Sequence, residues 1–276
     1  MSMTRRMFVA TAGAAAAQAC GLTAVQASQL NLLDKTLIAI LADGKKYTLP
    51  KRSSFIIATD QLIKAEGPEQ LCRDQQGVCR TNYDAGVVEL TPYLLKVLNV
   101  VNAVVNDNFD PTSDLELYGV PEKWVQHNAA HIFGKVKGDC EKHALIKRQI
   151  LIWLTANKTG QRLFPPGSLM ITIGGVPRDM ENEGHAWLTV RTDHGDLTLC
   201  NLFPDVRPMA EVNYFLYAIS SPAGLSRWHV VQPSMQAPGA WDRNDILAMQ
   251  PSGFYDPTPI QPAETSSWRR KALGLD

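Results

Sequence analysis

Residues 138–155 read GDCEKHALIKRQILIWLT and place a cysteine at the beginning of a predicted helix. Apolar residues recur at helical spacing after the cysteine, so we expect a buried helix over 141–155. These residues are Ala144, Leu145, Ile146, Ile150, Leu151 and Leu154. Free amide groups at a helix N-terminus favour a thiolate, which makes Cys140 a candidate nucleophile. The alternative is a structural thiol in a decayed site.

Apolar or alternating segments that follow this helix predict strands, separated by turns that contain glycine. They lie at 169–173, 185–192 and 197–202. His185 begins the second segment and is a candidate base that accepts or shares the proton of Cys140. A lone histidine on a strand is usually a core residue. The surrounding Gly-His-Ala-Trp at 184–187 and the cysteine upstream favour the catalytic role.

A third polar group should orient the imidazole of a catalytic histidine. Because side chains alternate along a strand, a tight turn near 192–195 places position 200 on the same face as His185. Position 200 is a cysteine. A neutral thiol is a weak hydrogen-bond partner, so Cys200 is a weak orienter that Asn201 or a water could assist. Asp205 is a less favourable substitute, because the same alternation places it on the opposite face.

Separated motifs along the chain resemble, in their order, those of the bacterial transglutaminase-like cysteine proteinases. The motifs lie at 98–108, 114–120, 138–141, 184–187 and 195–197, within a resemblance that covers roughly 68–232. The resemblance implies an α+β, papain-like fold of the transglutaminase type, with a helix-borne cysteine packed on a small antiparallel sheet. It also implies hydrolysis of a protein substrate, such as a cell-surface or exported protein, through a Cys-His-Asp triad.

The chain departs from this family pattern at the triad. Carried over by position, Cys140 is the nucleophile and His185 the base, but the aspartate of the family falls on Cys200. Three functions therefore stay open. The leading prediction is a cysteine peptidase with an impaired rate. The alternatives are a degenerate member that binds a protein or peptide without cutting it, and acyl transfer from a protein glutamine to an amine.

A second departure concerns calcium. Asp139 and Glu141 match positions that the resemblance links to a calcium ion, so they are candidate calcium ligands. Lys142 follows where the family has a carboxylate, and it places a positive charge beside any cation. Zinc is a further alternative, because cysteine and histidine ligands suit that metal. The set for zinc is Cys140, His143, His185 and Cys200.

The N-terminal residues indicate export. Arg5 and Arg6 precede a short Ala-rich run, which predicts a twin-arginine signal over 1–27 and a periplasmic or secreted protein. Cys20 is an alternative lipidation site. The run is too short to span a membrane, and no later stretch is long enough. Lys+Arg and Asp+Glu both number 27, so no overall basic field favours a nucleic-acid partner.

The remainder divides into an N-terminal segment of unknown role at 28–67, the proteinase domain at 68–235 and a Pro-rich polar tail at 236–276. Within the domain, Thr91 and Pro92 predict the start of a buried helix that ends near 106. Cys72 and Cys79 lie in a polar loop and would form a local disulfide in an oxidising compartment. Free thiols or half of a metal site are the alternatives.

Overall fold

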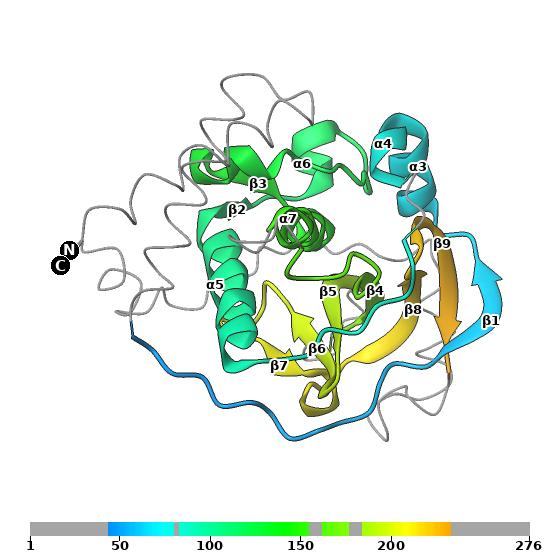
Figure 1. Cartoon of the computed structure of the whole chain (residues 1–276). Coiled ribbons are helices and arrows are strands. Elements are labelled where there is room, and N and C mark those ends of the chain that lie inside the picture. Colours follow the sequence, from blue (N-terminus) through cyan, green and yellow to red (C-terminus); the bar gives the residue numbers. More distant parts are fainter. Residues whose placement is uncertain (1–43, 80–82, 155–161, 177–183, 233–276) are drawn as a thin grey trace.

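The computed structural model describes residues 44–79, 83–154, 162–176 and 184–232 (Figure 1). The predicted export signal, Cys20 and the tail at 236–276 lie outside this part. Among the described helices, none combines the length and the apolar character that a membrane span requires.

The described part is built on a seven-stranded sheet in the order β1-β9-β8-β4-β5-β6-β7, whose paired neighbours all run antiparallel. The strands are β1 (Ala58–Ile63), β4 (Leu169–Gly175), β5 (Gly184–Thr192), β6 (Gly195–Leu199), β7 (Arg207–Pro208), β8 (Phe215–Ser221) and β9 (Gly224–Val231). A separate parallel pair joins β2 (Phe109–Pro111) and β3 (Val136–Gly138). The three predicted strands are β4, β5 and β6, and the last ends at Leu199 rather than at position 202.

The helices confirm the α+β prediction. They are α3 (Glu66–Asp74), α4 (Gln76–Cys79), α5 (Pro92–Asn108), α6 (Asp114–Tyr118) and α7 (Cys140–Trp153), with 3-10 turns η1 (Ala129–Gly134) and η2 (Met209–Glu211). The side chain of Thr91 accepts a hydrogen bond from the N–H of Leu94, which caps α5 as the sequence predicts. α7 packs against β5 and α5, and Figure 1 shows it between the sheet and the β2–β3 pair.

The apolar residues of β5 divide between two clusters according to the face on which they lie. Leu188 and Val190 join Leu145 of α7 in the larger cluster. Trp187 points to the opposite face and joins Cys200 and Tyr214 in the smaller one. Because both faces are covered, β5 is buried along nearly all of its length. The strand that carries His185 is therefore held rigidly at the centre of the fold.

Part of the N-terminal segment is joined to the sheet. β1 pairs with β9 at one edge. Asp196 of β6 is fully buried and accepts a hydrogen bond from the N–H of Ile56 at 2.6 Å. It also pairs with Arg191, whose guanidinium donates to the carbonyl of Ile56. Asp196 thus joins the chain near Ile56 to the β5–β6 hairpin.

The predicted disulfide is confirmed. Cys72 of α3 is bonded to Cys79, the last residue of α4. Leu71 is buried beside this link, so the disulfide closes the α3–α4 turn over the core.

Candidate active site

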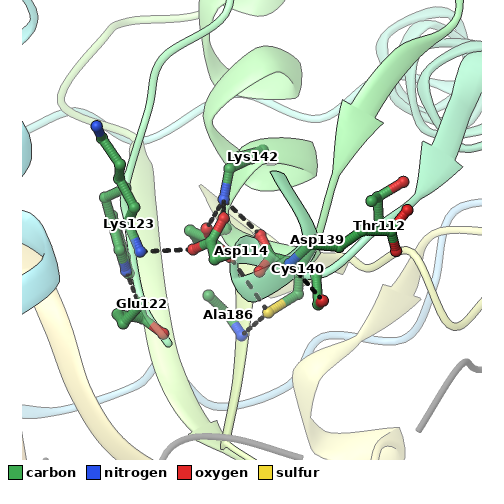
Figure 2. Close-up of polar contacts among 12 residues, drawn as sticks. Thr112, Asp114, Glu122, Lys123, Asp139, Cys140, Lys142 and Ala186 are labelled. Atoms are coloured by element: carbon green, nitrogen blue, oxygen red, sulfur yellow. Dashed lines mark hydrogen bonds and ion pairs between the residues drawn. The ribbon is translucent and has the colours of Figure 1, made fainter. Parts of the chain in front are cut away.

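Cys140 is the first residue of α7, one position earlier than the helix predicted from the apolar pattern. Asp139 precedes the helix as its N-cap residue in extended backbone. The N–H of Ala186 in β5 donates to the Cys140 Sγ atom at 3.4 Å (Figure 2). The sulfur therefore lies against the beginning of the strand that carries His185.

The surroundings of Cys140 oppose the predicted activation of its thiol. Burial of the sulfur, followed by the negative charges of Glu141 and Asp139, raises the pKa of Cys140 well above its usual value. The hydrogen bond from Ala186 acts in the opposite direction but does not outweigh these effects. Burial and the flanking carboxylates thus act against the helix N-terminus, which favours the thiolate. A base that accepts the proton of Cys140 is therefore needed before the sulfur can act as a nucleophile.

His185 is buried and forms a hydrogen bond with Cys200, with 3.0 Å between the Nε2 and Sγ atoms. The ring of Trp187 stacks on the imidazole with 5.8 Å between the ring centroids. The strand alternation therefore places position 200 correctly beside His185. The histidine has a defined orientation, set by a thiol where the family resemblance implies a carboxylate.

Cys200 has further polar neighbours that strand alternation does not predict. Its Sγ atom lies 3.3 Å from the Tyr214 hydroxyl and accepts the N–H of Leu202 at 3.2 Å. Asn201 lies farther away, with 3.9 Å between Sγ and Oδ1. Burial raises the pKa of Cys200, although the contact with Tyr214 lowers it in part. Tyr214 lies just before β8, and no spacing rule in the sequence connects that position to His185.

Asp205 does not take the place of the missing carboxylate. Its side chain is exposed and pairs with Arg207 at 3.4 Å. The prediction that it lies apart from position 200 agrees with this placement.

Asp139 and Glu141 form an acidic cluster with Asp114. The carboxylate oxygens of the three residues lie within 4.8 Å of one another. Asp114 is the first residue of α6 and is fully buried, so α6 and α7 bring the cluster together from distant parts of the chain. No local pattern in the sequence links Asp114 to Cys140, apart from its place in the motif at 114–120.

Lys142 occupies the centre of this cluster. Its Nζ atom lies 2.5 Å from Asp114 Oδ1 and 2.8 Å from Asp139 Oδ1, and it also donates to Glu141 Oε1. Figure 2 shows the Lys142 side chain directed at Asp114 and Asp139, next to Cys140. Burial lowers the pKa of Lys142, but the charges of Glu141, Asp139 and Asp114 outweigh burial and raise it. Lys142 therefore remains an ammonium ion.

The four residues of the zinc alternative are not assembled into a ligand set. Within the described part of the chain, the acidic cluster is the only group of three or more His, Cys, Asp or Glu residues whose ligand atoms lie this close together. His143 instead packs its ring on Phe109, with 3.9 Å between the centroids. Burial lowers the pKa of His143 well below its usual value, so the ring is neutral.

Comparison with known proteins identifies the family. Residues 63–236 match the family model described as bacterial transglutaminase-like cysteine proteinase, BTLCP. The chain belongs to this family. The match spans well over half of the chain and includes Cys140, His185 and Cys200, so the protein is a cysteine peptidase of the transglutaminase-like type, with a protein substrate.

Solved structures similar to this cysteine proteinase include two of LapG from Legionella pneumophila. The calcium-bound structure has 19% identity and a TM-score of 0.36, and the match covers 55% of this chain and 76% of that one. The other has 20% identity and a TM-score of 0.37, with 55% and 77% covered. A search of curated proteins found no significant match.

Proposed function

We propose that this proteinase hydrolyses a peptide bond through an acyl-enzyme on Cys140, with His185 as the base and Cys200 as its orienting partner. The observation that carries the proposal is the position of β5. Its Ala186 N–H contacts the Cys140 sulfur, and the preceding residue, His185, is held by Cys200 at 3.0 Å. One rigid strand thus connects the nucleophile to the base and its orienter.

The reaction begins when the Cys140 thiol transfers its proton to His185 and the sulfur attacks the carbonyl carbon of the substrate. The backbone N–H of Cys140, at the helix N-terminus, is placed to stabilise the oxyanion that forms. His185 then donates the proton to the leaving amine, and the C–N bond breaks. Water, deprotonated by His185, attacks the thioester, releases the acid product and regenerates the thiol.

The rate should be lower than that of a triad with a carboxylate. A neutral Cys200 thiol orients the imidazole through a hydrogen bond but does not stabilise the imidazolium charge. The nucleophile, the base and the oxyanion donor remain, so we expect slow turnover rather than none.

Two other functions use the same residues. A degenerate member would bind a peptide or surface protein in the same place without cutting it, and the Cys200 substitution favours that reading. Acyl transfer from a protein glutamine would replace water by an amine in the last step. Incorporation of a small labelled amine into a glutamine-bearing protein distinguishes transfer from hydrolysis.

The same proposal includes export through the twin-arginine pathway to the periplasm or beyond. The Cys72–Cys79 disulfide supports it, because such bonds persist in oxidising compartments. Retention of a fusion to this N-terminus inside cells after replacement of Arg5 and Arg6 by lysine would support the assignment.

Calcium does not fit the cluster while Lys142 is in place. Three carboxylates are the hard oxygen ligands that Ca²⁺ takes, and one LapG structure is titled calcium-bound. In this chain, however, each carboxylate already contacts the Lys142 ammonium. No step of the proposed mechanism involves a metal ion.

The test is hydrolysis of a peptide library by the wild-type protein and by Cys140→Ala and His185→Ala. We expect measurable cleavage by the wild type and none by Cys140→Ala. Binding of an intact partner that Cys140→Ala retains equally, with no fragments from the wild type, would instead favour the degenerate binder.

A further inference from the structure

The contacts of Lys142 account for all of the donors on its ammonium group. A lysine ammonium has three N–H donors and no acceptor. The Nζ atom of Lys142 meets one oxygen from each of Asp114, Asp139 and Glu141. The side chains of Lys142 and Asp114 are fully buried, and that of Glu141 is nearly so. The number of donors matches the number of carboxylates.

The surroundings fit a lysine rather than a hydrated ion. A Cβ atom added at Gly138 would lie 2.5 Å from the Cδ atom of Lys142, so the missing side chain of Gly138 makes room for the lysine stem. The ring of Tyr118 lies 5.7 Å from the Nζ atom, within the range of a cation–π contact. The ammonium group is thus enclosed by Gly138, the Tyr118 ring and the three carboxylates, which lie on different helices and strands.

Without the ammonium, the cluster would be a strongly anionic site beside the nucleophile. Three carboxylates whose oxygens lie within 4.8 Å of one another repel each other and need a counter-charge. A hard divalent cation is the usual counter-charge for such a group of oxygens. Lys142 supplies one positive charge from within the chain, at the point where its Nζ atom contacts all three carboxylates.

We infer that Lys142 is a built-in cation that replaces a divalent ion in the cluster, and is the positioning residue for Asp139 and Glu141. These two residues flank Cys140 directly in sequence, so the lysine also holds the backbone at the start of α7. The functional part of this inference rests on the proposed role of Cys140. Its consequence is a proteinase whose nucleophile is positioned without calcium and is insensitive to chelators.

The experiment compares the wild-type protein with Lys142→Ser, which removes the ammonium and leaves room for an ion. The matched control is Lys137→Ser, because Lys137 lies on the adjacent β3 with a side chain that is 54% exposed. The readouts are calorimetric titration with CaCl₂, the thermal unfolding midpoint with CaCl₂ or EDTA, and the alkylation rate of Cys140. None of them requires peptide hydrolysis, so a failure of the proposed peptidase activity would be recognised separately.

We expect no calcium binding and no effect of EDTA for the wild type and Lys137→Ser. Lys142→Ser should bind one Ca²⁺ with a Kd on the order of 10⁻⁴ M. Its alkylation rate should fall about 10-fold without calcium, the scale of a lost supporting contact, and recover when calcium is added.

Calcium binding by the wild type, or a lowered midpoint in EDTA, would overturn the inference. So would a Lys142→Ser protein that matches Lys137→Ser in all readouts. If Lys142→Ser does not fold, the titration and the EDTA measurement on the wild type decide the question alone.

Discussion

The Nε2 atom of His185 lies 3.0 Å from the Sγ atom of Cys200. A thiol therefore occupies the place of the residue that orients the histidine, in a buried site that also contains the Tyr214 hydroxyl. The thiol orients the imidazole through a hydrogen bond. It places little negative charge beside the ring, because burial raises the pKa of Cys200. The side chain at position 200 therefore determines how strongly a protonated His185 is stabilised, and a single substitution there should change the rate of the enzyme.

Cys200→Asp should increase kcat/KM by about 100-fold, because a carboxylate at this position stabilises the imidazolium that forms when His185 takes the proton. The measurement is steady-state cleavage of the best peptide from the library. Cys200→Ser is the matched control, since it keeps a neutral hydrogen-bonding side chain and should give no such increase. Equal rates for the Asp and Ser variants would show that Cys200 does not orient the base.

Lys147→Met should stabilise the protein, and more so at neutral than at alkaline pH. Lys147 is fully buried, and its Nζ atom has no hydrogen-bond partner among the described residues. Burial lowers the pKa of Lys147 to about 7. The unfolded chain therefore binds more protons between about pH 7 and 10.5, and the stability of the wild type rises across that window.

The expected gain for Lys147→Met is on the order of 4 kcal/mol near pH 7 and declines toward pH 10. Urea unfolding at pH 7, 8.5 and 10 measures it, with the exposed Lys137→Met as the control. A gain that is the same at every pH would contradict the assignment of a neutral, buried lysine.

Asp196→Ala should destabilise the fold by about 3 kcal/mol, because it removes the counter-charge of Arg191 and leaves the N–H of Ile56 without its acceptor. Thermal or urea unfolding measures the change. Asp205→Ala is the control, since its exposed pair with Arg207 should contribute less than about 1 kcal/mol. Similar losses for the two variants would argue against the attachment of the N-terminal segment through Asp196.

Replacement of both Cys72 and Cys79 by serine should lower the free energy of unfolding by about 2–3 kcal/mol, the loop-closure value for a sequence separation of 7. The alkylation rate of Cys140 should not change at temperatures where the variant is folded, because the link lies in α3 and α4, whereas Cys140 contacts Ala186 of β5 and His185 contacts Cys200. A loss of Cys140 reactivity in a folded variant would reveal a coupling that these contacts do not explain.

Local patterns were sufficient to predict the elements that carry the chemistry. The apolar spacing after Cys140 predicts α7, the Thr91-Pro92 pair predicts the start of α5, and strand alternation places Cys200 beside His185. Each of these relationships depends on neighbours in the chain or on a single tight turn. The sequence is therefore sufficient where the period of a helix or strand controls the geometry.

The electrostatic state of the site was decided only by the tertiary structure. A helix start alone predicts an acidic Cys140 thiol, whereas burial and the flanking carboxylates raise its pKa. Lys142 looks like an obstacle to a cation in the sequence, yet in the fold its ammonium is the cation of the cluster. Asp114 contacts the Lys142 ammonium from another helix, α6. The burial and the charge around a side chain depend on residues that the fold brings together from distant parts of the chain, so the sequence alone did not predict them.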